Sequence, residues 1–487
     1  MSMPNPWDGS GRGEWRTVLV YGLGASGRSA SRLLLALGAE VVAVDARPAD
    51  ALDFGDFTGW AGRDGLRVLA GEEPDALPPG VDAVVVSPGV PLNRPLLAEA
   101  GERGVPVLAE VELAFPYLTG PVVAVTGSNG KSTTTALAGA MLREAGFDAA
   151  VCGNFGPPLS AQVDLEAAVR QRAATAGGHG EGAGKVFVVE MSSFQLAAIR
   201  TFRPRAAALL NVAADHLDRH GGLEAYTAAK RRIFENQSAE DVAVLNADDP
   251  LSRETVVAAR GRLFSRLGPV DDGCYLDGER VIERGGGGAA VELFRADDSP
   301  LQGAHNLANA MAAALLARAL GAPPEACRAG LSGFRGFPHR MERVLESGGV
   351  VWYDDSKGTN PAAVLGCLEG FPDGSVHLIL GGRGKGTDFA VLASAARAKA
   401  VHVYLIGETA GELENALAGA APVVRAGTLD RAVAEAALRA RPGESVLLSP
   451  ACASFDQFRD FNQRGEAFQR LVHAIVGGGG SGQEAGL

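Results

Sequence analysis

Short runs of aliphatic and β-branched residues alternate along the chain with longer segments that have helical periodicity. Near the N-terminus, the apolar run 17–21 is followed by a glycine-rich turn and then by a helix-like segment that extends to Leu37. The same order of strand, turn and helix recurs up to the C-terminal part. Strands that alternate with helices are typical of βαβ units, so the pattern predicts an α/β protein with parallel sheets throughout.

The apolar runs also indicate where the domains lie. Besides 17–21, we expect strands at 40–44, 82–86, 122–126, 186–189, 350–353, 377–380, 401–406 and 445–448. At roughly 150 residues per domain, a chain of 487 residues should hold about three domains. The predicted domains cover residues 1–108, 109–336 and 337–487.

The segment 122–134 has the build of a phosphate-binding loop. An apolar β-branched run ends at Thr126, and a short loop with Gly127 and Gly130 leads to Lys131-Ser132-Thr133, which open a helix. Backbone N–H groups at a helix N-terminus face an anion, a lysine reaches the terminal phosphates, and a hydroxyl ligates Mg²⁺. Val125 stands where the strict motif has a glycine, yet an ordinary strand–turn–helix junction does not explain the order Gly-Lys-Ser-Thr. The segment predicts binding of a nucleoside triphosphate.

A second glycine turn follows the first predicted strand. Gly22, Gly24 and Gly27 match the dinucleotide fingerprint, and Asp45 ends the next strand at the usual distance. Taken alone, this turn favours an NAD-dependent dehydrogenase. Any diphosphate could use the same helix N-terminus, however, and glycines that serve only close packing are a further interpretation. A chain with both turns is typical of a kinase or ligase that acts on a nucleotide-linked substrate.

Composition and charge limit the possible partners. The chain has 46% hydrophobic and 21% charged residues and a net charge of −12, which argues against general binding to nucleic acid or anionic membranes. No apolar run reaches the ~20 residues of a membrane span, and residues 1–15 have no signal-peptide core. Five scattered cysteines without metal-ligand spacing favour a reducing cytoplasm. We therefore expect a cytoplasmic monomer that binds small molecules.

Three stretches have low complexity. We expect the Gly/Ala-rich segment 173–184 and the glycine run 285–288 to be mobile loops, and the tail from Gly477 to be disordered.

A series of motifs in a fixed order resembles the Mur ligase family over roughly residues 17–470. These motifs are Gly24-Ala-Ser-Gly27, Asp45-Ala-Arg47, Ser87-Pro-Gly89, Thr126-Gly-Ser-Asn-Gly-Lys-Ser-Thr133, Gly153-Asn154, Glu190-Met-Ser-Ser-Phe-Gln195, Asn211 with Asp215-His-Leu-Asp218, Ala229-Lys-Arg-Arg-Ile-Phe-Glu235, His305-Asn306, Asn309, Pro338-His-Arg-Met-Glu342, Asp355-Ser-Lys-Gly-Thr-Asn360 and Ser449-Pro-Ala-Cys-Ala-Ser-Phe-Asp-Gln-Phe458. The resemblance implies an N-terminal Rossmann-like domain that binds a UDP-linked substrate, a central P-loop ATPase-like domain and a C-terminal Rossmann-like domain that binds the amino acid.

The resemblance also implies a reaction, namely ATP-driven amide formation through an acyl phosphate in peptidoglycan precursor synthesis. The details of the motifs resemble the branch of the family that joins D-glutamate to UDP-N-acetylmuramoyl-L-alanine. A sibling ligase that adds another amino acid would share every ATP motif. An NAD-binding protein without ATP turnover is the alternative from another class.

Site residues are carried over only where this sequence matches the family motifs. The resemblance implies ATP contacts at Gly127, Asn129, Gly130, Lys131, Ser132, Thr133, Asn306, Asn309, Arg340 and Asp355. It implies contacts to the UDP-linked substrate at Gly24, Ser26, Asp45, Arg47, Ser87, Gly89 and Asn154. The D-glutamate site is implied at Lys357, Thr359, Lys385, Ser454 and Phe461.

The resemblance further implies two Mg²⁺ sites, with ligands at Ser132, Glu190, His216 and a carbamylated Lys230. Catalytic roles fall on Lys131, His216, Lys230 and Arg340. From the pattern alone, Lys230 heads an amphipathic helix and favours a solvated lysine, and Glu190 could be a surface residue at the end of a strand.

Three positions depart from the family pattern. Ala46 lacks the hydroxyl that relatives have beside the uracil, and a long insertion spans 173–184. Arg383 stands where relatives often carry an aspartate, and we expect its side chain to face solvent because glycines flank it on both sides.

Overall fold

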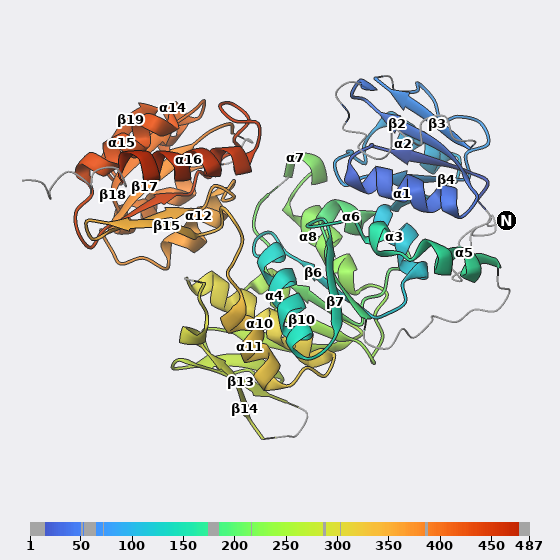
Figure 1. Cartoon of the computed structure of the whole chain (residues 1–487), viewed down its shortest axis with the longest axis horizontal. Helices are drawn as coiled ribbons and strands as arrows, with labels where there is room; N and C mark the ends of the chain where they lie inside the picture. Colours follow the sequence, from blue (N-terminus) through green and yellow to red (C-terminus); the bar gives the residue numbers. More distant parts are fainter. Residues whose placement is uncertain are drawn as a thin grey trace, which may run out of the picture. The chain divides into compact units, whose positions relative to one another are not determined.

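The computed structural model describes residues 15–49, 52, 65–71, 73–173, 185–215, 217–285, 289–301, 303–384 and 388–476 (Figure 1). The chain forms two compact units: the first comprises Met1–Asp298 with Asn309–Ser332, and the second comprises Ser299–Ala308 with Gly333–Leu487. His216 and Lys385 lie outside the described residues, as do almost all of the segments expected to be mobile or disordered.

The N-terminal sheet is built around the first glycine turn. Its five strands have the order β3-β2-β1-β4-β5 and are all parallel. They are β1 (Thr17–Tyr21), β2 (Glu40–Asp45), β3 (Leu66–Ala70), β4 (Ala83–Val86) and β5 (Val107–Ala109). The strand order reverses between β1 and β4, and in open α/β sheets a ligand binds at the carboxyl ends of the strands at such a point.

The middle sheet of the first unit carries the phosphate loop. Its nine strands have the order β14-β13-β12-β11-β10-β9-β6-β8-β7. They are β6 (Val122–Thr126), β7 (Asp148–Gly153), β8 (Lys185–Glu190), β9 (Ala206–Leu209), β10 (Val242–Asn246), β11 (Arg260–Ser265), β12 (Gly273–Asp277), β13 (Arg280–Arg284) and β14 (Val291–Arg295). Strands β12, β13 and β14 pair antiparallel.

The sheet of the second unit has six strands in the order β15-β16-β20-β17-β18-β19. They are β15 (Glu342–Ser347), β16 (Val350–Asp354), β17 (Val376–Gly381), β18 (Ala400–Ile406), β19 (Val423–Gly427) and β20 (Ser445–Leu448). β15 pairs antiparallel with β16, and the other pairs are parallel. Leu378 and Leu380 pack into one apolar core and Ile379 into another, because successive side chains of a strand face opposite sides. Both faces of this sheet are therefore buried.

Helices follow most of these strands. They are α1 (Ala25–Ala36), α2 (Pro95–Glu102), α3 (Glu110–Ala114), α4 (Lys131–Glu144), α5 (Leu165–Ala173), α6 (Ser193–Ala197), α7 (Leu217–His220), α8 (Leu223–Arg231), α9 (Pro250–Arg253), α10 (Ala304–Ala319), α11 (Pro324–Gly333), α12 (Pro361–Leu368), α13 (Ala393–Lys399), α14 (Ala410–Ala416), α15 (Leu429–Arg439) and α16 (Phe461–Ile475). In the first unit, α1 packs along the N-terminal sheet, and α4 packs against β6, β7 and β8 (Figure 1).

Most of the sequence-based fold predictions are confirmed. Each predicted strand is present within a residue or two of its expected bounds. The expectation of parallel sheets throughout is wrong at two places, the β12–β14 meander and the β15–β16 hairpin. Only two residues separate β12 from β13 and β15 from β16, and an antiparallel pair needs no helical crossover. All five cysteines are free and buried, as expected for a reducing environment.

Among the described residues, no helix combines the length and the apolar character that a membrane crossing requires.

Candidate active site

The phosphate loop lies between β6 and α4. Gly130 caps α4 at its N-terminus with φ 82°, a left-handed conformation that glycine adopts without strain. A Cβ atom at Gly130 would lie 2.1 Å from Asn309 Oδ1, so a larger residue would also collide with α10. The backbone N–H groups at the start of α4 are therefore presented by a turn that only glycine can form.

Neighbouring strands hold this loop in place. Asn211, just beyond the end of β9, accepts from Asn129 N–H at 2.9 Å and donates to Asn129 O at 3.1 Å. Ser128 Oγ donates to Ala213 O at 2.9 Å and accepts from Ala213 N–H. β9 pairs directly with β6, which brings these groups to the same edge of the sheet. The loop is thus preorganised by hydrogen bonds from a segment more than eighty residues away.

Two lysines converge on one carbonyl of the loop. Lys131 Nζ donates to Gly127 O and to Ser128 O, both at 2.9 Å. Lys230 Nζ donates to Gly127 O at 2.7 Å. Two lysine side chains at one carbonyl oxygen place hydrogen-bond donors beside the loop, where a polyphosphate would need them.

Lys230 is neither solvated nor at the head of its helix, so both expectations from the local pattern are wrong. It lies in the last turn of α8, is 1% exposed, and shares the buried face with Tyr226, whose ring centre is 4.4 Å from Nζ. Burial, with the charge of Lys131, lowers the pKa of Lys230 well below that of an ordinary lysine. Lys230 is therefore a buried amine beside the phosphate loop.

Glu190 ends β8 beside the loop. It is 3% exposed, so it is not a surface residue, and its Oε2 accepts from Ser132 Oγ at 2.5 Å. Its other oxygen, Oε1, accepts from Asn154 Nδ2 at 2.8 Å. A buried carboxylate and a hydroxyl in direct contact form the kind of oxygen-rich donor set that Mg²⁺ prefers. Ser132 and Glu190 therefore fit a magnesium site, and their partners in that site would include phosphate oxygens.

A cavity of about 550 Å³ lies at the carboxyl ends of β1, β2 and β4. All seven residues that the sequence assigns to the UDP-linked substrate line it: Gly24, Ser26, Asp45, Arg47, Ser87, Gly89 and Asn154. Because Asn154 also bonds Glu190, one side chain joins the wall of this cavity to the magnesium-type donor set of the phosphate loop.

The acid of this cavity is held in its ionised form. Asp45 Oδ2 accepts from Leu23 N–H at 2.7 Å, and both of its oxygens accept from the Arg47 guanidinium. Burial opposes ionisation, but these hydrogen bonds prevail and lower the pKa of Asp45 to about 2. Asp45 is therefore a charged acceptor at neutral pH, suited to the hydroxyl or N–H groups of a nucleoside.

The first glycine turn is also packed tightly. Ser87 Oγ donates to Gly22 O at 2.7 Å, and a Cβ atom at Gly27 would lie 1.8 Å from the same oxygen. By contrast, a Cβ atom at Gly24 would meet nothing within 4 Å. Gly27 is therefore needed for the fold, and Gly24 keeps the cavity open.

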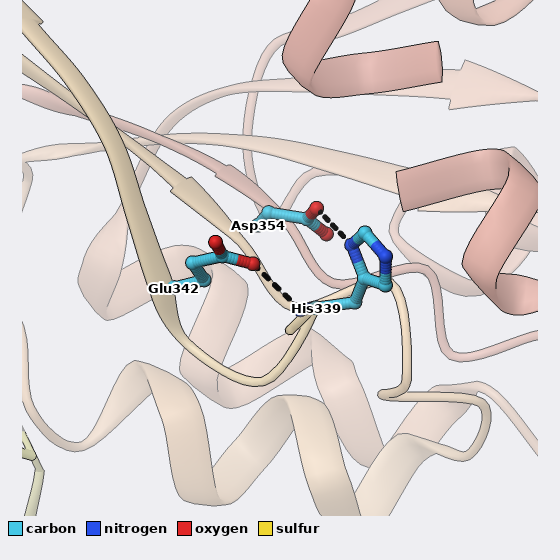
Figure 2. A group of neighbouring side chains, drawn as sticks. All are labelled: His339, Glu342 and Asp354. Atoms are coloured by element: carbon cyan, nitrogen blue, oxygen red, sulfur yellow. Dashed lines mark hydrogen bonds and ion pairs between the residues drawn. The ribbon is translucent and has the colours of Figure 1, made fainter. Parts of the chain in front are cut away.

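In the second unit, a hydrogen-bonded cluster flanks Arg340 (Figure 2). His339 Nδ1 lies 2.7 Å from Asp354 Oδ2, and Glu342 accepts from His339 N–H at 2.8 Å. Gln469 Nε2 donates to Glu342 and to Asp354. The hydrogen bond to Asp354 raises the pKa of His339.

This cluster fixes an unusual backbone. His339 and Met341 have φ values of 62° and 48°, a left-handed conformation that costs roughly 1–3 kcal/mol per non-glycine residue. Arg340 lies between these two residues in the sequence.

Asp355 lies at the end of β16 and is buried. Its Oδ2 accepts from Ser449 Oγ at 2.7 Å and from the Cys367 thiol at 3.2 Å. Burial raises the pKa of Asp355 to about 6, although both hydrogen bonds and the charge of Arg340 act in the opposite direction.

The residues predicted to bind D-glutamate, called the acceptor residues below, come from three described segments of the second unit, while Lys385 lies outside the described residues. Phe461 is the first residue of α16, and Lys357 Nζ lies 3.7 Å from the centre of its ring. Ser356 Oγ donates to Phe461 O at 2.8 Å, which joins the Lys357–Thr359 loop to the helix. Ser454 is buried in the middle of the loop between β20 and α16. The structure thus brings Lys357 and Phe461 into contact.

Arg383 faces solvent, as expected. Its side chain is 51% exposed and pairs with Glu408 at 3.1 Å, while its backbone bonds to Ala453 in both directions. The charge that departs from the family pattern is therefore neutralised by a surface carboxylate.

Comparison with known proteins identifies the family. Residues 16–109 match the "Mur ligase MurD-like, N-terminal domain", 125–317 the "Mur ligase middle domain" and 339–452 the "Mur ligase, glutamate ligase domain". The chain is 47% identical over 466 residues to the UDP-N-acetylmuramoylalanine--D-glutamate ligase of Myxococcus xanthus, covering 94% of this chain and 98% of the relative. It is 44% identical to the protein of the same name from Anaeromyxobacter dehalogenans, covering 93% and 97%. The chain belongs to the Mur ligase family.

Solved Mur ligase structures share the fold. The MurF ligase of Thermotoga maritima in complex with ADP superimposes with a TM-score of 0.57 at 18% identity, covering 90% of this chain and 95% of that chain. The UDP-N-acetylmuramate-alanine ligase of the same organism superimposes with a TM-score of 0.55 at 18% identity, covering 95% and 100%. The three-domain α/β architecture predicted for this Mur ligase is therefore confirmed.

The structure brings several of the predicted site residues of this Mur ligase together. The UDP-substrate residues share one cavity, and Ser132 contacts Glu190. Asn306 and Asn309 are both buried on α10, and Thr134 Oγ1 donates to Asn309 at 3.3 Å. The roles of all these residues stay predictions.

Sequence reasoning missed three supporting residues. It gave no role to Asn211, which holds the phosphate loop, to His339, which flanks Arg340, or to Arg464, which is buried in α16. The position of Asn211 just after β9, the strand that pairs with β6, could have indicated its role. No local signal marks the other two.

Proposed function

We propose that this chain joins D-glutamate to UDP-N-acetylmuramoyl-L-alanine with the hydrolysis of ATP, in peptidoglycan precursor synthesis. One observation carries the proposal. A phosphate loop with a magnesium-type donor set adjoins a separate cavity for a nucleotide-linked substrate, and Asn154 connects the two. The relatives named UDP-N-acetylmuramoylalanine--D-glutamate ligase, 40–47% identical over nearly their full length, support the choice of substrates.

The first step is phosphoryl transfer from ATP to the alanyl carboxylate of the UDP-linked substrate. The carboxylate oxygen forms a bond to the γ-phosphorus, and the bond to the β,γ-bridging oxygen breaks to release ADP. Positioning and charge neutralisation provide most of the acceleration in such transfers. In this chain, Lys131 would leave the loop carbonyls and bind the terminal phosphates, and Arg340 is proposed to add a second cation.

Magnesium and a carbamate on Lys230 belong to the proposal. Ser132 and Glu190 would hold one Mg²⁺, and His216 and carbamylated Lys230 a second. Bound Mg²⁺ would neutralise phosphate charge and orient the oxygens. A buried neutral lysine can add CO₂ with loss of a proton and so become an anionic oxygen ligand, and the lowered pKa of Lys230 fits this requirement.

The second step is attack by the amine of D-glutamate on the acyl phosphate, from which phosphate leaves. The two carboxylates of D-glutamate require cations and hydrogen-bond donors. Lys357, Thr359, Lys385, Ser454 and Phe461 are proposed to provide them, with Asp355, Asn306 and Asn309 as ATP contacts.

Three domains with separate tasks follow from this proposal. Residues 1–108 would bind the UDP-linked substrate, 109–336 ATP, and 337–487 the amino acid. The enzyme would act in the cytoplasm, where ATP is available.

Phosphate release tests the proposal. Purified chain should release phosphate from ATP only when both UDP-N-acetylmuramoyl-L-alanine and D-glutamate are present. A panel of other amino acids, including L-alanine and a diamino acid, is the control. Turnover with another amino acid and none with D-glutamate would point to a sibling ligase, and NAD binding without ATP turnover would overturn the proposal.

A further inference from the structure

Arg464 is a buried cation in the second unit without an ionic partner. Its side chain is 1% exposed, and no carboxylate among the described residues lies within ion-pair distance of it. Its Nη1 group has no hydrogen-bond partner in the part of the chain that the structure describes. Burial lowers the pKa of Arg464 to about 10, which still leaves the guanidinium charged at neutral pH.

The guanidinium connects the segments that carry the proposed acceptor residues. Its Nε donates to Ser356 Oγ at 3.0 Å and its Nη2 to Ser356 O at 2.8 Å, directly before Lys357. Nη2 also donates to Cys452 O at 3.1 Å, two residues before Ser454. Arg464 itself lies in the first turn of α16, which begins at Phe461.

The unpartnered nitrogen faces a glycine loop. A Cβ atom at Gly382, just after β17, would lie 3.2 Å from Arg464 Nη1. Gly382 has φ 140°, and its carbonyl accepts from Thr409, so the loop is held close to the guanidinium. Arg464 is therefore the common neighbour of four segments at the carboxyl edge of the sheet.

A buried charge without a counter-ion is costly and is normally paired. The four segments around Arg464 are those proposed to bind an amino acid with two carboxylates. Asp354, Asp355 and Asp456 favour the charged form of Arg464 electrostatically, and its direct hydrogen bonds go to the loops proposed to hold that amino acid.

We propose that Arg464 is the positioning residue of the D-glutamate site: it holds the Lys357 and Ser454 loops against α16 in the geometry that binds the amino acid. The inference rests on the proposed function, because it names a further determinant of D-glutamate binding at the same site. Arg464 is a positioning residue because it acts through the backbone of Ser356 and Cys452.

Steady-state kinetics of two variants test the proposal. Arg464→Lys keeps the charge but loses the forked hydrogen bonds, and Arg464→Met loses both. KM for D-glutamate should rise about tenfold in Arg464→Lys and about a hundredfold in Arg464→Met, while KM for ATP changes less than about twofold. A merely structural role would raise both KM values together or leave both unchanged, and either result would overturn the inference.

The control is Arg470→Met on the same helix. Arg470 is 68% exposed and pairs only with Glu466 at the surface, so its loss should leave KM for D-glutamate unchanged. Thermal unfolding of each variant establishes that the folded fraction is equal at the assay temperature. If Arg464→Met does not fold, Arg464→Lys alone decides: an unchanged KM for D-glutamate overturns the inference.

The wild-type enzyme separates this inference from the proposed function. Absence of D-glutamate-dependent phosphate release in the wild type would refute the proposed function. Normal release in the wild type with unchanged KM values in both Arg464 variants would refute the positioning role alone.

Discussion

The two glycine turns of the first unit have the same local build but different surroundings. Each follows a buried parallel strand and presents the N-terminus of a helix, α1 in one case and α4 in the other. Beside the first turn, Arg47 is neutralised by Asp45. Beside the second lie Lys131 and Lys230. The backbone turn can hold phosphate, and we expect the side chains beside it, here Lys131 of α4 and Lys230 of α8, to decide whether phosphate is only bound or also transferred.

The glycines of the two turns also differ in what they protect. Gly130 keeps clear of the Asn309 side chain, which is predicted to contact ATP. Gly27 keeps clear of the Gly22 carbonyl, which belongs to the framework. We therefore expect substitution of Gly27 to lower stability and substitution of Gly130 to lower activity.

The largest expected effect is at Lys131. Lys131→Ala should lower kcat by more than about a hundredfold, because it deletes the charge that stabilises the transferring phosphoryl group. KM for the UDP-linked substrate should not change. The measurement is steady-state phosphate release. Lys185→Ala is the matched control, since Lys185 begins β8 at the end opposite Glu190, and near-normal turnover in Lys131→Ala would refute the role.

Lys230 sharpens the comparison, because it reaches its loop from another helix, α8, whereas Arg28, which donates to Leu23 O at the first turn, lies on α1 itself. Lys230→Ala should be almost inactive, and acetate or another small carboxylate should restore part of the activity if the working group is a carbamate. The lowered pKa of Lys230 favours the neutral amine that carbamate formation needs. Activity of the wild type should fall when CO₂ and bicarbonate are removed. Rescue by an amine in place of a carboxylate would identify a plain cation.

The two glycines of the first turn should behave differently on substitution by alanine. Gly27→Ala places Cβ against Gly22 O and should destabilise the protein by roughly 1–3 kcal/mol or more, seen as a lower Tm. Gly24→Ala meets no atom, so its Tm should change little, but KM for the UDP-linked substrate should rise about tenfold because the methyl group enters the cavity. Equal loss of Tm in both variants would contradict this distinction.

The sequence alone was sufficient to place these turns. The strand bounds, the phosphate loop and Asp45 at the end of β2 follow from local patterns, because strand ends and glycine turns are local features. The burial of Lys230 does not, since a lysine on an amphipathic helix is typical of a solvated face, and only the packing of α8 on the loop buries it. The antiparallel β12–β14 strands and the contacts of Arg464 depend on tertiary pairing that no local pattern contains.

The smallest expected effect is at Arg383. Arg383→Asp removes an exposed ion pair with Glu408 and should change neither KM for D-glutamate nor Tm measurably. The kinetic assay with varied D-glutamate is the measurement. A large rise in that KM would instead make Arg383 a substrate contact and would show that the departure from the family pattern alters the acceptor site.

Isothermal titration calorimetry of the Lys131→Ala and Gly24→Ala variants tests the division of labour between the two turns most directly. Each variant is titrated with UDP-N-acetylmuramoyl-L-alanine and, separately, with a non-hydrolysable ATP analogue and Mg²⁺. We predict that Lys131→Ala keeps its affinity for the UDP-linked substrate and loses at least about tenfold in affinity for the ATP analogue, with the reverse for Gly24→Ala. If either variant loses affinity for both ligands equally, or if NAD displaces the UDP-linked substrate from the wild type, the two turns do not have the separate roles assigned to them.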